Sequence, residues 1–197
     1  YVGVEVGIPT FANLFMTSPE INIDPTIAGS VVGTYWFLMM IGRLCGASIG
    51  AKVSSRAMLT VVSTVGIVLV LGAIFCADNI LVNMPVFKSD ISFGFAQVPV
   101  NVMLLILCGL CTSVMWGGIF NLAVEGLGKY TAAASGLFMV MVCGGGILPL
   151  IQGGVADFAG FLNSYWVIAL GLAYILFYAA IGSKNVNTDI PTDDYEA

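Results

Sequence analysis

Residues 1–15 read YVGVEVGIPTFANLF, and a single carboxylate, Glu5, lies among valines in this stretch. The alternation of apolar residues from Val2 to Ile8 would indicate a β-strand in a water-soluble protein. In a bilayer, however, an isolated strand leaves its backbone N–H and C=O groups without partners, and the long apolar runs downstream differ from the short strands of a barrel. We therefore predict that this stretch is a membrane-spanning helix.

The composition of the chain is that of a membrane protein. Of the 197 residues, 59% are hydrophobic and 9% are charged, with a mean hydropathy of +1.02, whereas soluble domains carry roughly a quarter charged residues. A membrane helix needs about 20 apolar residues, and the apolar runs predict an all-α protein with six such spans. They cover about residues 1–17, 26–51, 57–77, 100–124, 132–156 and 164–182.

The polar segments between these runs are short, except for the connection at 78–99 and the acidic tail at 183–197. The tail holds four of the eleven acidic residues, so the net charge of −5 describes the tail more than a binding surface. We expect it to be disordered. Six lysines and arginines are too few to build a basic stripe for nucleic acid, and we expect no such partner.

The basic residues predict an orientation, because short cytoplasmic loops accumulate lysine and arginine. Five of the six lie on one side of the predicted spans (Arg43, Lys52, Arg56, Lys129 and Lys184), and Lys88 lies on the other. We expect both ends of the chain and the acidic tail to be cytoplasmic. Because the chain starts at Tyr1 without an initiator methionine or a signal peptide, we also expect it to be a fragment.

On a helix, Glu5, Pro9 and Asn13 share one face, since they lie at i, i+4 and i+8. Counting back from Ser18 places Glu5 deep in the membrane, roughly 20 Å from the outer end of the helix. Acidic residues at such depth usually face a bundle interior or a wet cavity and often mark a transport path. We predict that Glu5 and Asn13 bind or couple a substrate. The alternative is that Glu5 is neutral or hydrogen-bonded and only fixes helix packing.

Other polar and aromatic residues within the spans are suited to a sugar pocket. Amides pair with hydroxyl groups, and aromatic rings stack on the apolar face of a sugar. Those predicted to contribute are Tyr35, Trp36, Trp116, Asn121 and Gln152. Trp116 and Asn121 are the best placed, on a helix that we expect to be interrupted by Gly117–Gly118. For each residue alone, interhelical packing explains its presence equally well.

Two spans carry stripes of small or helix-breaking residues at intervals of four: Gly42, Gly46 and Gly50, and then Gly145, Pro149 and Gly153. Such a match is expected of a three-plus-three inverted repeat, as in many transporters. Small residues also let any two membrane helices approach closely, so both interpretations stay open. In the first interpretation Gly42, Gly46, Gly145 and Pro149 take part in conformational change.

No cofactor or metal site is predicted. The five cysteines lie within apolar runs and their number is odd, and the one C-x-x-C pair, Cys108 and Cys111, has no second pair and no histidine to complete a metal site. Free cysteines in such positions are packing residues. The sequence also lacks the common hydrolytic motifs, which disfavours an enzyme.

Three stretches together carry a family resemblance: residues 1–15, residues 41–56 (IGRLCGASIGAKVSSR) and the glycine-rich residues 115–160. They resemble the seventh, eighth, and tenth to eleventh helices of the fucose/glucose/galactose-proton symporter family of the major facilitator superfamily. The resemblance implies the C-terminal half of a twelve-helix transporter in a bacterial inner membrane. Sugar, proton, the lipid bilayer and a missing N-terminal six-helix half would be its partners. It also implies transport by alternating access.

Within this resemblance, Glu5 and Asn13 match polar positions of the seventh helix, and Arg43 with Gly42 and Gly46 matches a cytoplasmic G-R-x-x-G turn with a conformational role. Gly117–Gly118 departs from the family, in which an F-P-T type sequence is expected. The acids assigned to proton coupling in the family lie in its N-terminal half, so Glu5 is not required to carry the proton.

Two other functions fit the same sequence. An exporter of drugs or other amphiphiles would use an apolar, adaptable pocket, and the chain has 9 methionines and 12 phenylalanines. A receptor or scaffold would bind a ligand without moving it across the membrane.

Overall fold

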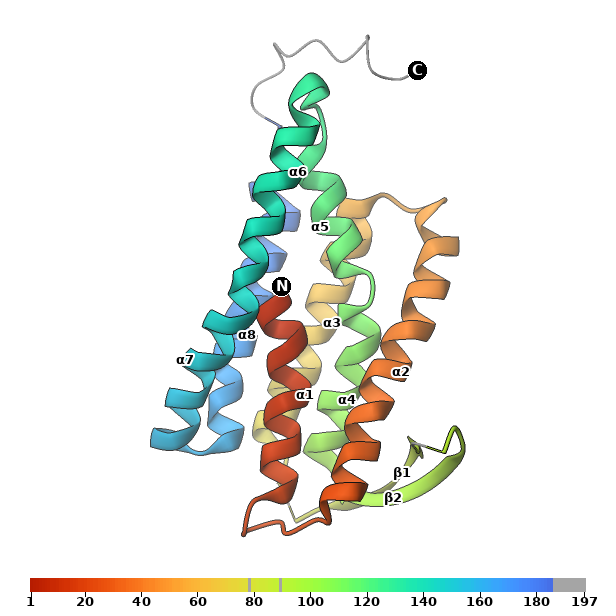
Figure 1. Ribbon diagram of the computed structural model, residues 1–197, viewed down its shortest axis with the longest axis vertical. Coiled ribbons are helices and arrows are strands. Elements are labelled where there is room, and N and C mark those ends of the chain that lie inside the picture. The colour runs from red at the N-terminus through yellow and green to blue at the C-terminus, as the bar shows by residue number, and fades with distance from the viewer. Residues whose placement is uncertain (78, 89, 186–197) are drawn as a thin grey trace.

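A computed structural model describes residues 1–77, 79–88 and 90–185 (Figure 1). Within these residues, three helices precede a β-hairpin and the remaining helices follow it. The elements are α1 (Val2–Thr17), α2 (Pro25–Gly50), α3 (Ser55–Phe75), β1 (Leu81–Phe87), β2 (Phe93–Pro99), α4 (Val100–Thr112), α5 (Met115–Val124), α6 (Thr131–Val140), α7 (Gly144–Ala159) and α8 (Phe161–Phe177). Most of the tail expected at 183–197 lies outside the described residues.

Five helical segments are long and apolar enough to cross a membrane, and α1 is a shorter apolar helix. Two of the five are composite. One joins α4 to α5, and another joins α6 to α7 through the 3₁₀ turn Met141–Cys143; the last, Phe161–Gly182, ends in a π-helical turn. The predicted fold class, a helical membrane bundle, is confirmed.

Local sequence explains where the second and third helices begin. Asp24 caps α2, because its carboxylate accepts a hydrogen bond of 2.8 Å from the backbone N–H of Thr26, and Pro25 occupies the first helical position. The same backbone hydrogen bond lowers the pKa of Asp24. Ser54 caps α3 through the backbone N–H of Ala57. Polar side chains therefore cap the N-terminal ends of the apolar helices α2 and α3.

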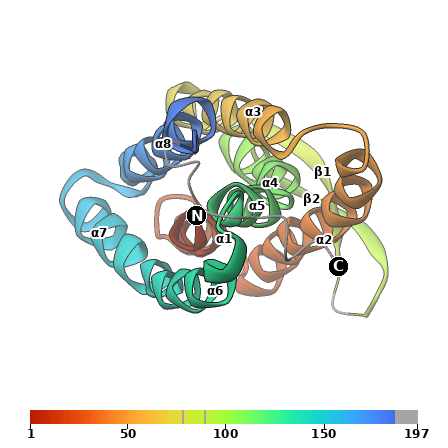
Figure 2. The ribbon, with the colours of Figure 1, turned by 90° about the horizontal axis from the view of Figure 1, so that it is seen from above.

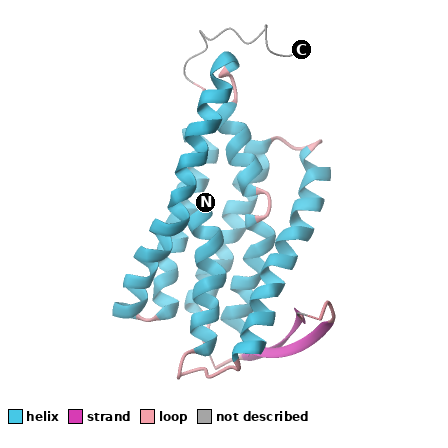
Figure 3. Cartoon of the chain, in the orientation of Figure 1, coloured by secondary structure: helices cyan, strands magenta, loops and turns pink. Residues whose placement is uncertain are grey.

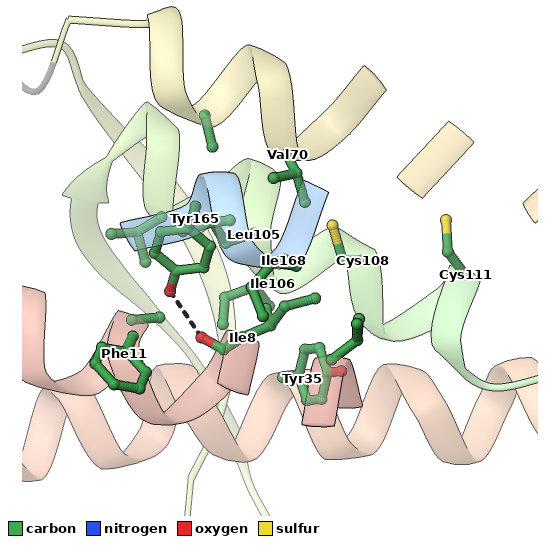
Figure 4. Close-up of a cluster of buried hydrophobic side chains, with 14 of the residues drawn as sticks. Ile8, Phe11, Tyr35, Val70, Leu105, Ile106, Cys108, Cys111, Tyr165 and Ile168 are labelled. Atoms are coloured by element: carbon green, nitrogen blue, oxygen red, sulfur yellow. Dashed lines mark hydrogen bonds between the residues drawn. The ribbon is translucent and has the colours of Figure 1, made fainter. Parts of the chain in front are cut away.

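Helix α1 has the most central position in the bundle. It packs against α2, α4, α7 and α8 (Figure 2), and its buried face meets the apolar core shown in Figure 4, which includes Ile106 and Ile168. Within this core the hydroxyl of Tyr165 donates a hydrogen bond of 2.8 Å to the backbone oxygen of Ile8. The hydroxyl group of a fully buried tyrosine is thereby satisfied.

Several glycines allow the helices to approach closely. A Cβ atom on Gly109 of α4 would lie 2.6 Å from the backbone oxygen of Tyr35 in α2. Gly42 and Gly46 of α2 lie directly against Ser113 and Val114. These contacts agree with the close-packing interpretation of the glycine stripes.

The connection at 78–99 contains a β-hairpin that the sequence analysis did not predict (Figure 3). Strands β1 and β2 pair antiparallel from Leu81 with Pro99 to Phe87 with Phe93. Their residues alternate in burial, with Met84, Val86 and Val98 facing inward. Each strand is too short to be recognised as a membrane span from its hydropathy. Only a search for apolar residues at every second position would have indicated the two strands.

All five cysteines are free, and the C-x-x-C pair is buried: Cys108 and Cys111 lie one turn apart on α4 (Figure 4). Among the described residues, no group of three or more potential ligands could hold a metal ion.

We predict that Gly109→Ala lowers the free energy of unfolding by about 1–3 kcal/mol, because the added methyl group meets the backbone of α2. Thermal unfolding of the purified protein in detergent measures the effect. Gly117→Ala is the matched control, since a Cβ atom there has no neighbour within 4 Å. Equal melting temperatures for the two variants would contradict the close contact.

Candidate functional site

A cavity of about 760 Å³ is lined by Tyr1, Val2 and Glu5 at the N-terminal end of α1. This end of α1 lies at mid-height of the bundle (Figure 1). Its walls come from α1, α2, α5 and the beginning of α3. The polar and aromatic side chains that line it include Tyr1, Glu5, Arg43, Trp116 and Asn121. The cavity therefore brings together residues from segments far apart in the sequence. Of these five residues, all except Tyr1 were predicted from the sequence.

The charged centre of this cavity is an ion pair between α1 and α2. A guanidinium nitrogen of Arg43 lies 3.2 Å from Oε1 of Glu5. This ion pair is the one salt bridge found among residues 1–77, 79–88 and 90–185. The Glu5 side chain is 14% exposed and that of Arg43 is 56% exposed. Burial of Glu5 makes the pair sensitive to loss of either partner, although exposure of Arg43 to solvent weakens their attraction.

The position of Arg43 corrects one expectation. The resemblance placed Gly42, Arg43 and Gly46 in a cytoplasmic turn, but all three lie inside α2, which continues to Gly50. The glycines face the α4–α5 junction, and Arg43 also contacts Sδ of Met39 at 3.4 Å. An arginine inside an apolar helix needs a partner, and Glu5 provides it.

Pro9 explains a second contact between α1 and α2. A proline inside a helix has no N–H for the carbonyl four residues earlier, which here is that of Glu5. The hydroxyl of Tyr35 donates to this carbonyl oxygen at 3.2 Å and lies 3.0 Å from Oγ1 of Thr112. Tyr35 therefore replaces the hydrogen bond lost to Pro9 and links α1, α2 and α4.

The helix that lines the opposite wall is broken at mid-span. Helix α4 ends at Thr112 and α5 starts at Met115, so the interruption lies at Ser113–Val114, whereas Gly117–Gly118 lie inside α5. Both the junction and the first turn of α5 line the cavity. The N-terminal end of a half-helix carries partial positive charge, which suits polar or anionic groups in a membrane cavity.

Of the predicted residues on this wall, Trp116 and Asn121 both line the cavity. The indole of Trp116 packs on Tyr1 and Phe138, with ring centroids 5.9 and 5.0 Å apart. Nδ2 of Asn121 donates to Oγ of Ser55 at 3.3 Å. The sequence analysis missed Tyr1, whose hydroxyl donates to the backbone oxygen of Thr112 at 3.1 Å.

The other predicted residues lie elsewhere. Tyr35 is fully buried, and Trp36 lines a separate groove between α2 and the hairpin. Gln152 is fully buried between α1 and α8, where its Nε2 donates to Oγ of Ser164 at 3.4 Å. Asn13 is partly buried on α1, two turns beyond Glu5, and does not line the cavity.

The two conformational candidates of the fifth span lie in α7. A Cβ atom on Gly145 would meet Val2 of α1 at 2.8 Å, and Pro149 lies within the helix, partly buried. Gly145 therefore marks another close approach to α1.

The fold matches a solved transporter structure. A crystal structure of the major facilitator superfamily transporter FucP, in the outward conformation, superposes with a TM-score of 0.77 over 94% of this chain and 40% of that chain, at 21% sequence identity. The chain has the fold of one half of a major facilitator superfamily transporter.

Sequence comparison finds relatives that are named as sugar transporters. Glucose/galactose transporters of two strains of Brucella abortus are each 30% identical to this chain over 186 residues, which is 94% of this chain and 40% of theirs. The L-fucose-proton symporter of Escherichia coli is 33% identical over 92 residues, or 46% of this chain and 21% of that protein. The chain spans about two fifths of the length of the first of these curated relatives. No protein-family model matches it.

We predict that Tyr35→Phe costs about 1–3 kcal/mol of stability, because it leaves the Glu5 carbonyl without a donor. Thermal unfolding of the purified protein measures this loss. The exposed Tyr174→Phe is the control.

Pro9→Ala restores a backbone donor for the Glu5 carbonyl, so Tyr35→Phe is expected to cost less in that background. A cost independent of residue 9 would contradict the proposed replacement of one hydrogen bond by the other.

Proposed function

We propose that this chain is the C-terminal half of a secondary active transporter that takes up a hexose, such as fucose, glucose or galactose, by proton symport. The observation that carries the proposal is the Glu5–Arg43 pair inside a mid-bundle cavity. The names of the relatives, glucose/galactose transporter and L-fucose-proton symporter, support the substrate class.

The cavity contains the groups that a sugar needs. The carboxylate of Glu5 accepts hydrogen bonds from hydroxyl groups, the guanidinium of Arg43 donates to them, and the indole of Trp116 offers an apolar face. In the absence of sugar, Glu5 and Arg43 satisfy each other. A sugar that inserts its hydroxyls between them exchanges one set of polar partners for another, so the charges are not left unpaired.

Transport requires a second six-helix half, because alternating access is a rocking of two bundles around a central site. The coverage of about two fifths of the relatives supports such a partner. Since Glu5 already has a cation as its partner, we assign proton coupling to the other half and sugar binding to this one.

We further propose that the protein lies in a bacterial inner membrane with the α2–α3 and α5–α6 connections on the cytoplasmic side. The N-terminal end of α1 lies at mid-height of the bundle, so the expectation that both chain ends are cytoplasmic is not kept for that end (Figure 1). The α2–α3 and α5–α6 connections, which carry Lys52 and Lys129, lie at the end of the bundle opposite the hairpin with Lys88 (Figure 1). This distribution fits the preference of cytoplasmic loops for basic residues, and the relatives are bacterial.

An exporter of amphiphiles is the second candidate function. It is favoured by an adjoining apolar cavity of about 430 Å³, whose walls include Trp116, Phe138 and Met141. Adaptable surfaces rich in methionine and aromatic residues suit amphiphilic ligands.

The substrate class is tested with the complete native protein in liposomes. We expect an inward proton gradient to drive accumulation of a radiolabelled hexose, and a protonophore to abolish it. Liposomes without protein are the control. Accumulation of lipophilic cations without hexose would establish the exporter, whereas hexose binding without flux would establish a receptor.

The ion pair is tested with Glu5→Gln and Arg43→Gln in the same assay. Each leaves one charged group without its partner, and we expect hexose uptake to fall at least about 10-fold, as for the loss of one charge-assisted contact. Lys129→Gln, at the connection before α6, is the matched control. Unchanged hexose affinity and uptake at all pH values in Glu5→Gln would leave Glu5 with a packing role.

A further inference from the structure

Two cavities of the bundle meet at a shared wall. The first holds the Glu5–Arg43 ion pair, and we call it the Glu5 cavity; the second is the apolar cavity of about 430 Å³ beside it. Four residues line both cavities: Tyr1, Val2, Trp116 and Val142. Because the same residues line both spaces, the two cavities are separated by no more than the width of these residues.

The two cavities differ in chemistry. Glu5 and Arg43 line the Glu5 cavity, whereas none of the described residues that line the apolar cavity carries a charge. Aromatic rings form much of the apolar wall: Tyr1, Trp116, Phe138, Tyr174 and Tyr178. The hydroxyl of Tyr1 already donates to the backbone oxygen of Thr112 at 3.1 Å. An uncharged, apolar group suits this cavity, because it gives up no hydrogen bond to water on entering it.

The indole of Trp116 connects the two walls. Its ring centroid lies 5.9 Å from that of Tyr1, which also lines both cavities, and 5.0 Å from that of Phe138. Phe138 lines only the apolar cavity. The ring of Phe138 packs in turn on Phe120, with centroids 5.4 Å apart and planes at 72°. Contacting rings therefore join the wall of the Glu5 cavity to the wall of the apolar cavity.

The apolar cavity has room for an aromatic group. A cavity of about 150 Å³ with apolar walls is sufficient to hold benzene. The volume of about 430 Å³ therefore leaves space for a phenyl ring and several further carbon atoms. Both cavities also lie within the range of roughly 300–1,000 Å³ that is usual for small-molecule sites.

We propose that the two cavities form one site for neutral aryl hexosides, in which the sugar occupies the Glu5 cavity and the aryl aglycone occupies the apolar cavity. This inference rests on the proposed function, because it takes a hexose as the ligand of the Glu5 cavity. The sugar hydroxyls meet the Glu5–Arg43 pair, and the aryl ring meets Trp116 and Phe138. A glycosidic bond holds the two groups side by side, as the shared wall requires. A free hexose fills only the first cavity.

Competition binding to the complete native protein tests the site, with the radiolabelled hexose that the uptake assay identifies. Its methyl and phenyl glycosides, each as the α and the β anomer, are the competitors. We expect the phenyl glycoside of the preferred anomer to compete at least about 10-fold better than the methyl glycoside, because a phenyl ring leaves water. Equal competition would overturn the aglycone site and leave the hexose site in place. Binding of neither the hexose nor its methyl glycoside would overturn the proposed function, and this inference with it.

Phe138→Ala tests where the aglycone lies, because Phe138 lines the apolar cavity and not the Glu5 cavity. We expect the ratio of phenyl-glycoside affinity to methyl-glycoside affinity to fall about threefold, the contribution of one aromatic pair. This ratio compares two ligands in one variant, so a general change in sugar affinity cancels. Leu137→Ala is the matched control, since Leu137 is exposed and lines neither cavity. An unchanged ratio in Phe138→Ala would contradict the placement of the aryl ring.

A photoreactive azidophenyl glycoside of the same hexose locates the aryl group without any substitution. We expect the label on residues that line the apolar cavity, within 115–144 or 174–178. Excess methyl glycoside is expected to prevent labelling, because the sugar holds the aryl ring in place. Labelling of other segments would overturn the proposal. Labelling that the methyl glycoside does not prevent would also overturn it, since the cavity would then take apolar groups without a sugar.

Discussion

A carboxylate held inside an apolar bundle needs a partner from another helix, and α2 supplies partners for both polar groups of Glu5. Arg43 pairs with its side chain and Tyr35 donates to its backbone oxygen. Tyr35 and Arg43 are eight residues apart, about two turns, and therefore lie on one face of α2. Two contacts of different kinds fix the register of α1 against α2, and a shift of either helix would break both.

This arrangement depends on small residues at the contacts of α2. Gly109 lets α4 approach the backbone of Tyr35, while Gly42 and Gly46 fit against Ser113 and Val114. Those two residues form the break between α4 and α5, so the glycines of α2 face the interruption between these two helices. Close approach thus brings the ion pair and the broken helix into one cavity.

Hydropathy predicted the fold class because the membrane requires long apolar runs. Glu5 was predicted as a site residue because it is a lone carboxylate within such a run. The partner of Glu5 was beyond prediction, since the sequence places Arg43 near the end of a span, where basic residues are usual. Tyr35 and Trp36 show a similar limit. They are adjacent, but Tyr35 lies in the core and Trp36 lines the groove between α2 and the hairpin, and only tertiary contacts distinguish the two faces. The hairpin was missed because its pattern has a period of two over short strands.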